Sequence, residues 1–197
     1  MLPEILVLKT KLSAWSKENK LNSSPFWQSW RLPIQQQPPD IVTYGESMTR
    51  RLAKDSGCKP LIMKRKECIG PAHYRDNVLL GVKPGQWLWQ REILLGNKRP
   101  WLYGFTMTLP ASRCASLWDL HHIGRKPLGE KLFTTRQVYR QFFDVGEINQ
   151  KHYLWQRVKR MHTDLPETLW TRCSLFSYQG KALLLYEVLL PDCPGIG

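Results

Sequence analysis

The feature that most constrains this chain is a pair of apolar runs separated by a short turn. Residues 87–95 and 100–109 are rich in aromatic and aliphatic side chains, and the turn residues 96–98 read Gly-Asn-Lys. Glycine and asparagine favour the tight turns between antiparallel strands, so this pattern predicts a β-hairpin. Alternate residues of a strand point to the same side. One face of the second strand is therefore expected to carry Trp101, Tyr103, Phe105, Met107 and Leu109.

The rest of the chain extends this hairpin into a larger sheet with helices. Apolar runs predict further strands near residues 61–67, 137–145, 153–161, 169–177 and 182–190. One helix is predicted over residues 48–54, with Ser47 as its N-cap and Gly57 near its end, and another over residues 112–121. This order of elements indicates an α+β fold with a largely antiparallel sheet.

Length and charge limit the classes of function. The chain of 197 residues suits a single domain, which we expect over residues 40–197, after an irregular N-terminal extension over residues 1–39. The net charge of +13 attracts anions in general, whether nucleic acid, an anionic metabolite or a membrane surface. No long block of like charge marks a nucleic-acid tail, so no nucleic-acid partner is expected. Without a signal peptide or a run of roughly 18 apolar residues, we expect a cytoplasmic protein with no membrane insertion.

The motifs of common metal and cofactor sites do not occur. The five cysteines include no Cys-x-x-Cys pair, and the adjacent His121 and His122 lack a third ligand at a useful spacing. Neither phosphate-binding glycine pattern, GxGxxG or GxxxxGK[ST], is found in the sequence. The sequence therefore predicts reduced thiols, no metal and no organic cofactor.

Two charged residues stand where the strand pattern places apolar side chains. Arg91 shares its predicted face with tryptophan, isoleucine and leucine, and Glu187 lies in a strand that is apolar on both faces. A buried charge must be paired or hydrogen-bonded, because isolation costs several kcal/mol. Two alternatives follow. Either Arg91 and Glu187 pair with each other or with neighbours, or each faces a ligand cavity. In a cavity, Arg91 would bind a carboxylate through two hydrogen bonds, and Glu187 would accept from a hydroxyl or act as a base.

Several short segments, taken in their order and spacing, resemble the chorismate–pyruvate lyases of bacterial ubiquinone synthesis. The segments are Glu46-Ser-Met-Thr49, Trp89-Gln-Arg-Glu-Ile-Leu-Leu95, Pro100-Trp-Leu102, Gly124-Arg-Lys-Pro-Leu-Gly129 with Leu132-Phe133 behind it, and Leu183-Leu-Leu-Tyr-Glu187 running to Leu190-Pro191. The resemblance runs from about Asp40 to Pro191, and residues 1–39 depart from it. It implies a six-stranded antiparallel sheet with helices packed against it, and an internal ligand cavity closed by helical flaps. It also implies no metal and no cofactor.

The resemblance further assigns a site. The family's ligand-binding positions fall on Met48, Arg91, Leu128 and Glu187. Arg91 and the backbone N–H groups of Met48 and Leu128 would hold the ring carboxylate, and Glu187 would meet the hydroxyl at the opposite end of the ring. The implied reaction eliminates pyruvate from chorismate to give 4-hydroxybenzoate, the first committed step towards ubiquinone. Arg91 and Glu187 would be its catalytic residues, and a monomer is expected.

A second class of function stays open beside the enzyme. The same general fold occurs in the ligand-sensing domains of bacterial transcription regulators, so the chain could be a non-catalytic module that binds a small carboxylate effector. Such domains normally follow a DNA-binding winged helix-turn-helix domain, which residues 1–39 are too short to supply. The sequence therefore favours the lyase.

Overall fold

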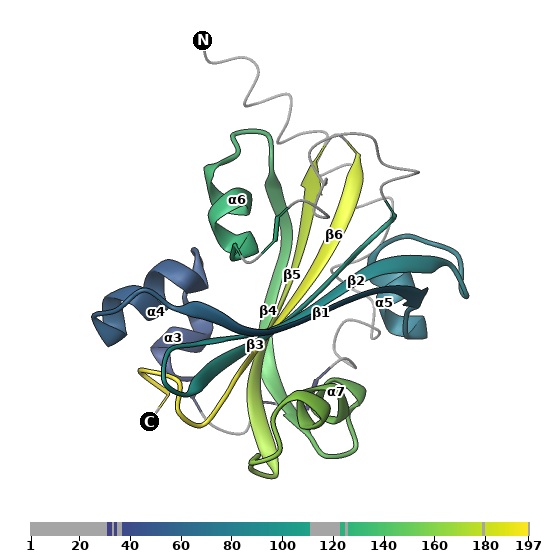
Figure 1. Cartoon of the computed structure of the whole chain (residues 1–197). Helices are drawn as coiled ribbons and strands as arrows, with labels where there is room; N and C mark the ends of the chain where they lie inside the picture. The colour runs from purple at the N-terminus through teal and green to yellow at the C-terminus, as the bar shows by residue number, and fades with distance from the viewer. Residues whose placement is uncertain are drawn as a thin grey trace.

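The computed structural model describes residues 31–32, 34, 37–110, 123–124, 126–178 and 180–196, apart from the side chain of residue 130. These residues contain an antiparallel six-stranded sheet with the order β1-β2-β3-β6-β5-β4 (Figure 1). Its strands are β1 (Leu61–Pro71), β2 (Trp87–Gly96), β3 (Pro100–Thr108), β4 (Tyr139–Asn149), β5 (Thr168–Tyr178) and β6 (Lys181–Leu189). The helices are α3 (Asp40–Thr43), α4 (Met48–Ser56), α5 (Tyr74–Leu79), α6 (Leu128–Thr134) and α7 (Tyr153–Met161). The predicted α+β fold is confirmed.

Strands β3 and β6 are the two central strands of the sheet. Strands β2 and β3 form the predicted hairpin, β5 and β6 form a second hairpin, and β6 also pairs with β3. Strand β3 therefore separates β2, which carries Arg91, from β6, which carries Glu187. The predicted helix over residues 112–121, the pair His121 and His122, and most of residues 1–39 lie outside the described residues.

Residues 153–161 form helix α7, so the strand predicted there is wrong. Leu154, Trp155 and Val158 are the buried residues of α7, and this spacing places them on one side of a helix. The His152 side chain accepts a hydrogen bond from the backbone N–H of Leu154 at 3.2 Å. This bond satisfies one of the free N–H groups of the first turn. A short run with several aromatic and aliphatic residues fits both the two-residue period of a strand and the 3.6-residue period of a helix. Here the run forms a helix. Helix α5 was not predicted.

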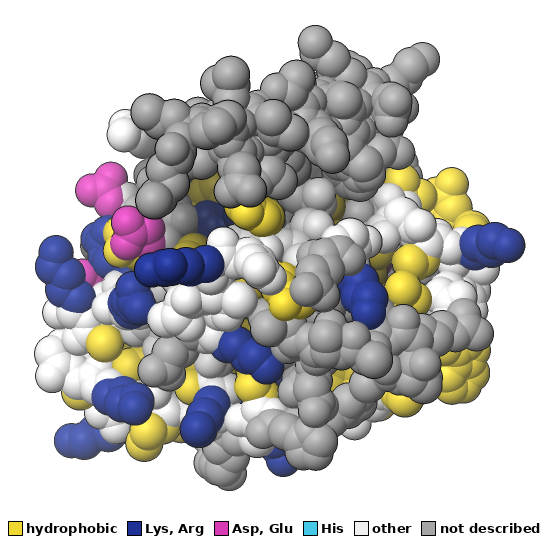
Figure 2. All heavy atoms as spheres, turned by 90° about the horizontal axis from the view of Figure 1, so that it is seen from above, with side chains coloured by type: hydrophobic (Ala, Val, Ile, Leu, Met, Phe, Trp, Pro, Cys, Tyr) yellow, Lys and Arg dark blue, Asp and Glu magenta, His cyan; other side chains and the backbone are white. Residues whose placement is uncertain are grey.

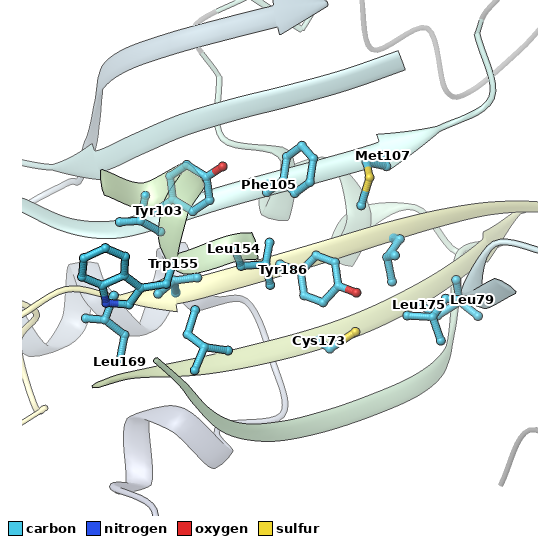
Figure 3. Packing of buried hydrophobic residues seen from close by; sticks show 14 of the residues in the cluster. Leu79, Tyr103, Phe105, Met107, Leu154, Trp155, Leu169, Cys173, Leu175 and Tyr186 are labelled. Atoms are coloured by element: carbon cyan, nitrogen blue, oxygen red, sulfur yellow. The ribbon is translucent and has the colours of Figure 1, made fainter. Parts of the chain in front are cut away.

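The larger core lies between one face of the sheet and helices α5 and α7, while α3, α4 and α6 lie on the other side (Figure 1). Figure 3 shows Tyr103, Phe105 and Met107 of β3 beside Tyr186 of β6, with Leu154 of α7 close to them. These five residues are at most 1% exposed. Burial of this apolar surface is the main stabilising contribution to the fold.

Strand alternation predicted that Trp101 and Tyr103 share a face. This prediction is wrong. Trp101 packs instead in the cluster beside α3 and α4. The register between β2 and β3 shifts between Leu95 and Gly96, next to the turn. Such an irregularity interrupts the strict alternation of sides at the end of a strand.

A buried carboxyl group connects this core to helix α7. Oδ1 of Asp76 accepts hydrogen bonds from the hydroxyl groups of Tyr153 at 2.6 Å and Tyr186 at 2.9 Å. Burial raises the pKa of Asp76, and the two hydrogen bonds partly offset this effect. The native state therefore keeps the Asp76 proton to a higher pH than the unfolded chain does. The stability contributed by this proton is present below the unfolded pKa, about 3.9, and is lost as the pH rises through the native pKa.

We expect the free energy of unfolding of Asp76→Asn to rise relative to that of wild type as the pH rises from about 4 to about 7. The reason is that the amide cannot ionise, whereas the buried Asp76 loses its proton over this range. Urea unfolding at several pH values measures the difference in the free energy of unfolding. Asp164→Asn is the matched control, since Asp164 is exposed. A difference between Asp76→Asn and wild type that stays constant with pH contradicts this expectation.

The described surface is basic without a single concentrated patch on the face shown in Figure 2. Lys and Arg side chains are scattered there among other side chains, and acidic groups gather at one edge. Within the described ranges, none of the helices is long and apolar enough to cross a membrane.

Candidate functional site

A pocket lies on the α4 and α6 side of the sheet, across strands β2, β3 and β6. The empty space within it is about 400 Å³, and part of this space is open to solvent. The pocket is lined by Thr49, Arg91, Ile93, Leu95, Leu102, Gly104, Thr106, Pro127, Leu128, Gly129, Leu185 and Glu187. Three of the four predicted ligand-binding residues therefore meet at this pocket. The fourth, Met48, precedes the lining residue Thr49 at the start of α4.

The register of the strands creates the space between the two predicted charges. Arg91 of β2 is paired with Thr106 of β3, and Glu187 of β6 is paired with Gly104 of β3. All four residues face the same side of the sheet, because paired residues share a side and alternate residues return to it. Small side chains on the middle strand leave room between a cation at one end and an anion at the other.

Arg91 is almost fully buried, with 1% of its surface exposed. Its Nε lies 3.2 Å from Oε1 of Glu67, the paired residue on β1. Its Nη2 donates to the backbone oxygens of Gly124 at 2.8 Å and Lys126 at 3.1 Å. Burial lowers the pKa of Arg91, and Glu67 opposes this. In the described part of the chain, no group accepts a hydrogen bond from Nη1.

Glu187 pairs with a neighbour and not with Arg91. Its Oε2 lies 3.1 Å from Nε of Arg172, the paired residue on β5. The Arg172 side chain is fully buried, and 12% of the Glu187 side chain is exposed. Among the described residues, Oε1 of Glu187 has no partner. The two predicted alternatives therefore combine, because each charge has a neighbouring counter-charge and also lines the pocket.

The N-terminal ends of α4 and α6 approach each other at the pocket. A Cβ atom at Gly129 would lie 3.2 Å from Oγ of Ser47 and 3.4 Å from Oγ1 of Thr49, so a larger residue would fit only tightly here. Ser47 occupies the N-cap position as predicted, but it makes no capping hydrogen bond. The first N–H groups of a helix lack intrahelical partners and attract anions. The anion-binding role predicted for the N–H groups of Met48 and Leu128 stays a prediction.

Comparisons with known proteins identify relatives of this chain. A family model described as "Chorismate lyase" matches residues 12–195. This chain belongs to the chorismate lyase family. A chorismate pyruvate-lyase from Citrobacter koseri is 31% identical over 157 residues, which cover 79% of this chain and 83% of that protein. A chorismate pyruvate-lyase from Salmonella arizonae shows the same identity and coverage. The family match begins at residue 12, within the segment predicted to be an extension.

Solved structures show how widely this fold is used. The C-terminal domain of PhnF has a TM-score of 0.52 with this chain at 12% identity, covering 83% of this chain and 96% of that domain. A putative GntR-family transcriptional regulator has a TM-score of 0.54 at 11% identity, covering 83% of this chain and 66% of that protein. At such low identity these likenesses concern the fold alone.

Two charged residues beside this pocket were missed from the sequence. Glu67 and Arg172 are the partners of the predicted charges, and each lies opposite its partner on a neighbouring strand. Arg172 carries the signal that revealed Arg91, since it shares a face with Trp170 and Phe176 in an apolar run. Glu67 gives no such signal, because β1 is mostly exposed.

Filling the space at Gly104 is expected to weaken ligand binding in this chorismate lyase. A Cβ atom there would lie 3.0 Å from Cγ1 of Ile93 and would stand in the pocket lining. We expect Gly104→Val to reduce the affinity for 4-hydroxybenzoate by about tenfold or more, because the added methyl groups overlap the ligand volume. Gly70→Val in β1 is the matched control, since a Cβ atom at Gly70 would meet a side-chain atom only at 3.8 Å. Calorimetric titration measures the affinity of both variants for 4-hydroxybenzoate. Equal affinities would refute the placement of the ligand beside Gly104.

Proposed function

We propose that this protein is a chorismate pyruvate-lyase, which converts chorismate into 4-hydroxybenzoate and pyruvate. The observation that carries the proposal is the pocket with Arg91 and Glu187 at its two ends, in a chain of the chorismate lyase family. Chorismate presents a ring carboxylate and, across the ring, a hydroxyl group. An arginine with a free donor suits the carboxylate, and a carboxylate with a free oxygen suits the hydroxyl.

The reaction needs little chemical assistance from the protein, because it makes the ring aromatic. The proton on C4 is removed, its bonding electrons form the new ring double bond, and the C3–O ether bond breaks. The leaving oxygen keeps its electron pair as the enolate of pyruvate, and the enolate takes up one proton at its methylene carbon. We propose that Arg91 and the N–H groups of Met48 and Leu128 hold the ring carboxylate. Glu187 orients the C4 hydroxyl and assists proton removal.

The proposal is tested by mixing the purified protein with chorismate and following 4-hydroxybenzoate by its absorbance and pyruvate by a coupled assay. Both products are expected in equal amounts, well above the spontaneous rate. Heat-inactivated protein is the control. Formation of neither product above that rate would sink the lyase proposal. Binding of 4-hydroxybenzoate without turnover would instead favour the effector-binding module.

We further propose that the enzyme acts in the cytoplasm as a monomer. Its ligands would be the substrate chorismate and the product 4-hydroxybenzoate, and the product would be used in ubiquinone synthesis. Helical segments at the pocket, including α6, which begins at the lining residue Leu128, would act as the flaps that close it. Size-exclusion chromatography with light scattering tests the monomer, since a dimer mass would contradict it.

A further inference from the structure

The charged residue at each end of the pocket belongs to a group of two arginines and one glutamate. At the first end, Oε1 of Glu67 lies 3.2 Å from Nε of Arg91 and 3.6 Å from Nη1 of Arg65. One carboxylate therefore serves two guanidinium groups. Among the described residues, this end retains one uncompensated positive charge, which the ring carboxylate of the proposed substrate would neutralise.

The second end repeats this imbalance with residues of β4 and β5. Glu187 pairs with Arg172, and Arg140 lies close enough to both for direct electrostatic interaction. Within the described ranges Arg140 pairs with no carboxylate. Its Nη1 donates to the backbone oxygen of Gly45, and its Nε is buried without an acceptor. Burial lowers the pKa of Arg140, and the neighbouring Arg172 lowers it further.

Aromatic rings hold these two guanidinium groups where carboxylates are lacking. The ring of Phe143 lies 4.8 Å from Cζ of Arg140 and 5.1 Å from Cζ of Arg172. Nε of Arg172 is also buried and makes no aligned hydrogen bond in the described structure. A ring face stabilises a cation less than a desolvated carboxylate does. Among the described residues, the cluster therefore holds one donor without an acceptor, Nε of Arg140, and one excess positive charge beside Glu187.

The chemistry of the proposed substrate fits this second excess charge. Chorismate is a dianion, and its second carboxylate is on the enolpyruvyl ether, at the ring carbon next to the hydroxyl that Glu187 would contact. We propose that Arg140 and Arg172 bind the enolpyruvyl carboxylate of the substrate, so that the two ends of the pocket select a dicarboxylate. This inference rests on the proposed function. When the ether bond breaks, the negative charge grows on the leaving enolate next to this carboxylate, and the same two cations stabilise it.

The test compares ligands with and without the second carboxylate. One probe is 4-hydroxybenzoate with a carboxymethoxy group on the ring carbon next to the hydroxyl, and its control is the methoxy analogue. Wild type, Arg140→Gln and the matched control Arg136→Gln are titrated by calorimetry, since Arg136 is exposed and loses the same charge. We expect Arg140→Gln to weaken the dicarboxylate about tenfold and the methoxy analogue less than about twofold. Arg136→Gln should leave both affinities within about twofold of wild type.

Three results would overturn the assignment. These are unchanged binding of the dicarboxylate to Arg140→Gln, equal weakening of both ligands, or the same loss in Arg136→Gln. Chorismate kinetics separate this inference from the lyase proposal. If wild type turns over chorismate and Arg140→Gln keeps the same kcat/KM, the inference fails while the lyase proposal stands. If wild type prefers the dicarboxylate through Arg140 but releases no product, the binding inference stands and the lyase proposal fails.

Discussion

Arg91→Met is expected to weaken 4-hydroxybenzoate binding about a hundredfold or more. The substitution keeps an unbranched side chain of similar length and removes the donor that faces the pocket. A charge-assisted hydrogen bond to a carboxylate contributes about 1.5–3 kcal/mol, and a bidentate one adds geometric specificity. Arg91 also donates to the backbone oxygens of Gly124 and Lys126, just before Leu128, so its loss loosens the segment that would present the Leu128 N–H group. Calorimetric titration measures the affinity directly.

Two further variants make this prediction specific. Arg91→Lys keeps the charge without the planar pair of donors, and an intermediate loss is expected. Arg99→Met removes an exposed arginine that pairs with Asp192, and no loss is expected beyond a small effect of net charge. Near-normal affinity in Arg91→Met, or an equal loss in Arg99→Met, would refute the carboxylate-binding role.

Glu187→Gln is expected to lower kcat for chorismate about a hundredfold or more and also to destabilise the protein. A general base contributes about 10²–10⁴ in rate, and the amide cannot accept the proton. The substitution also leaves the buried Arg172 without its counter-charge. Breaking a buried ion pair by removing one partner costs about 3–5 kcal/mol. Steady-state kinetics and urea unfolding measure the two effects separately.

The double variant Glu187→Gln with Arg172→Met tests whether the loss of kcat is only a consequence of lost stability. Replacing both charges removes the unpaired cation, and Met48 already lies beside this guanidinium, with its sulfur 3.9 Å from Nη1. We expect the free energy of unfolding to recover most of the loss, because a buried pair can often be replaced by apolar groups at little cost. The value of kcat should not recover. Recovery of kcat together with stability would mean that Glu187 has only a structural role.

The sequence revealed the two charges of the site because strand alternation is local. Arg91 and Glu187 stand in runs whose other members are apolar, and this is visible without any tertiary information. Their partners are fixed by the register between strands that are distant in the chain, which pairs residue 67 with 91 and residue 172 with 187. Local pattern does not determine that register. Arg172 was therefore visible as a charge in an apolar run, but neither it nor Glu67 could be assigned as a partner in advance.

The shape of the site depends on a different kind of information. The pocket exists because a glycine and a threonine on β3 face the cavity, whereas a glycine in a strand can equally mark a bulge or a tight bend. The error at residues 153–161 has a related cause, because a nine-residue run with clustered apolar side chains is compatible with both periods. Packing against the sheet decides between them, and a single sequence does not contain that packing.

The position of the pocket on the sheet bears on how this enzyme could be altered. The apolar core with α5 and α7 occupies one face, and the charged pocket beside α4 and α6 occupies the other. Energetic effects of substitutions add when the sites are well separated and share no partners. Stabilising changes in the α5 and α7 core should therefore raise the tolerance for costly substitutions in the pocket without changing ligand preference. Directed evolution of ligand preference could thus begin from a variant whose opposite face has first been reinforced.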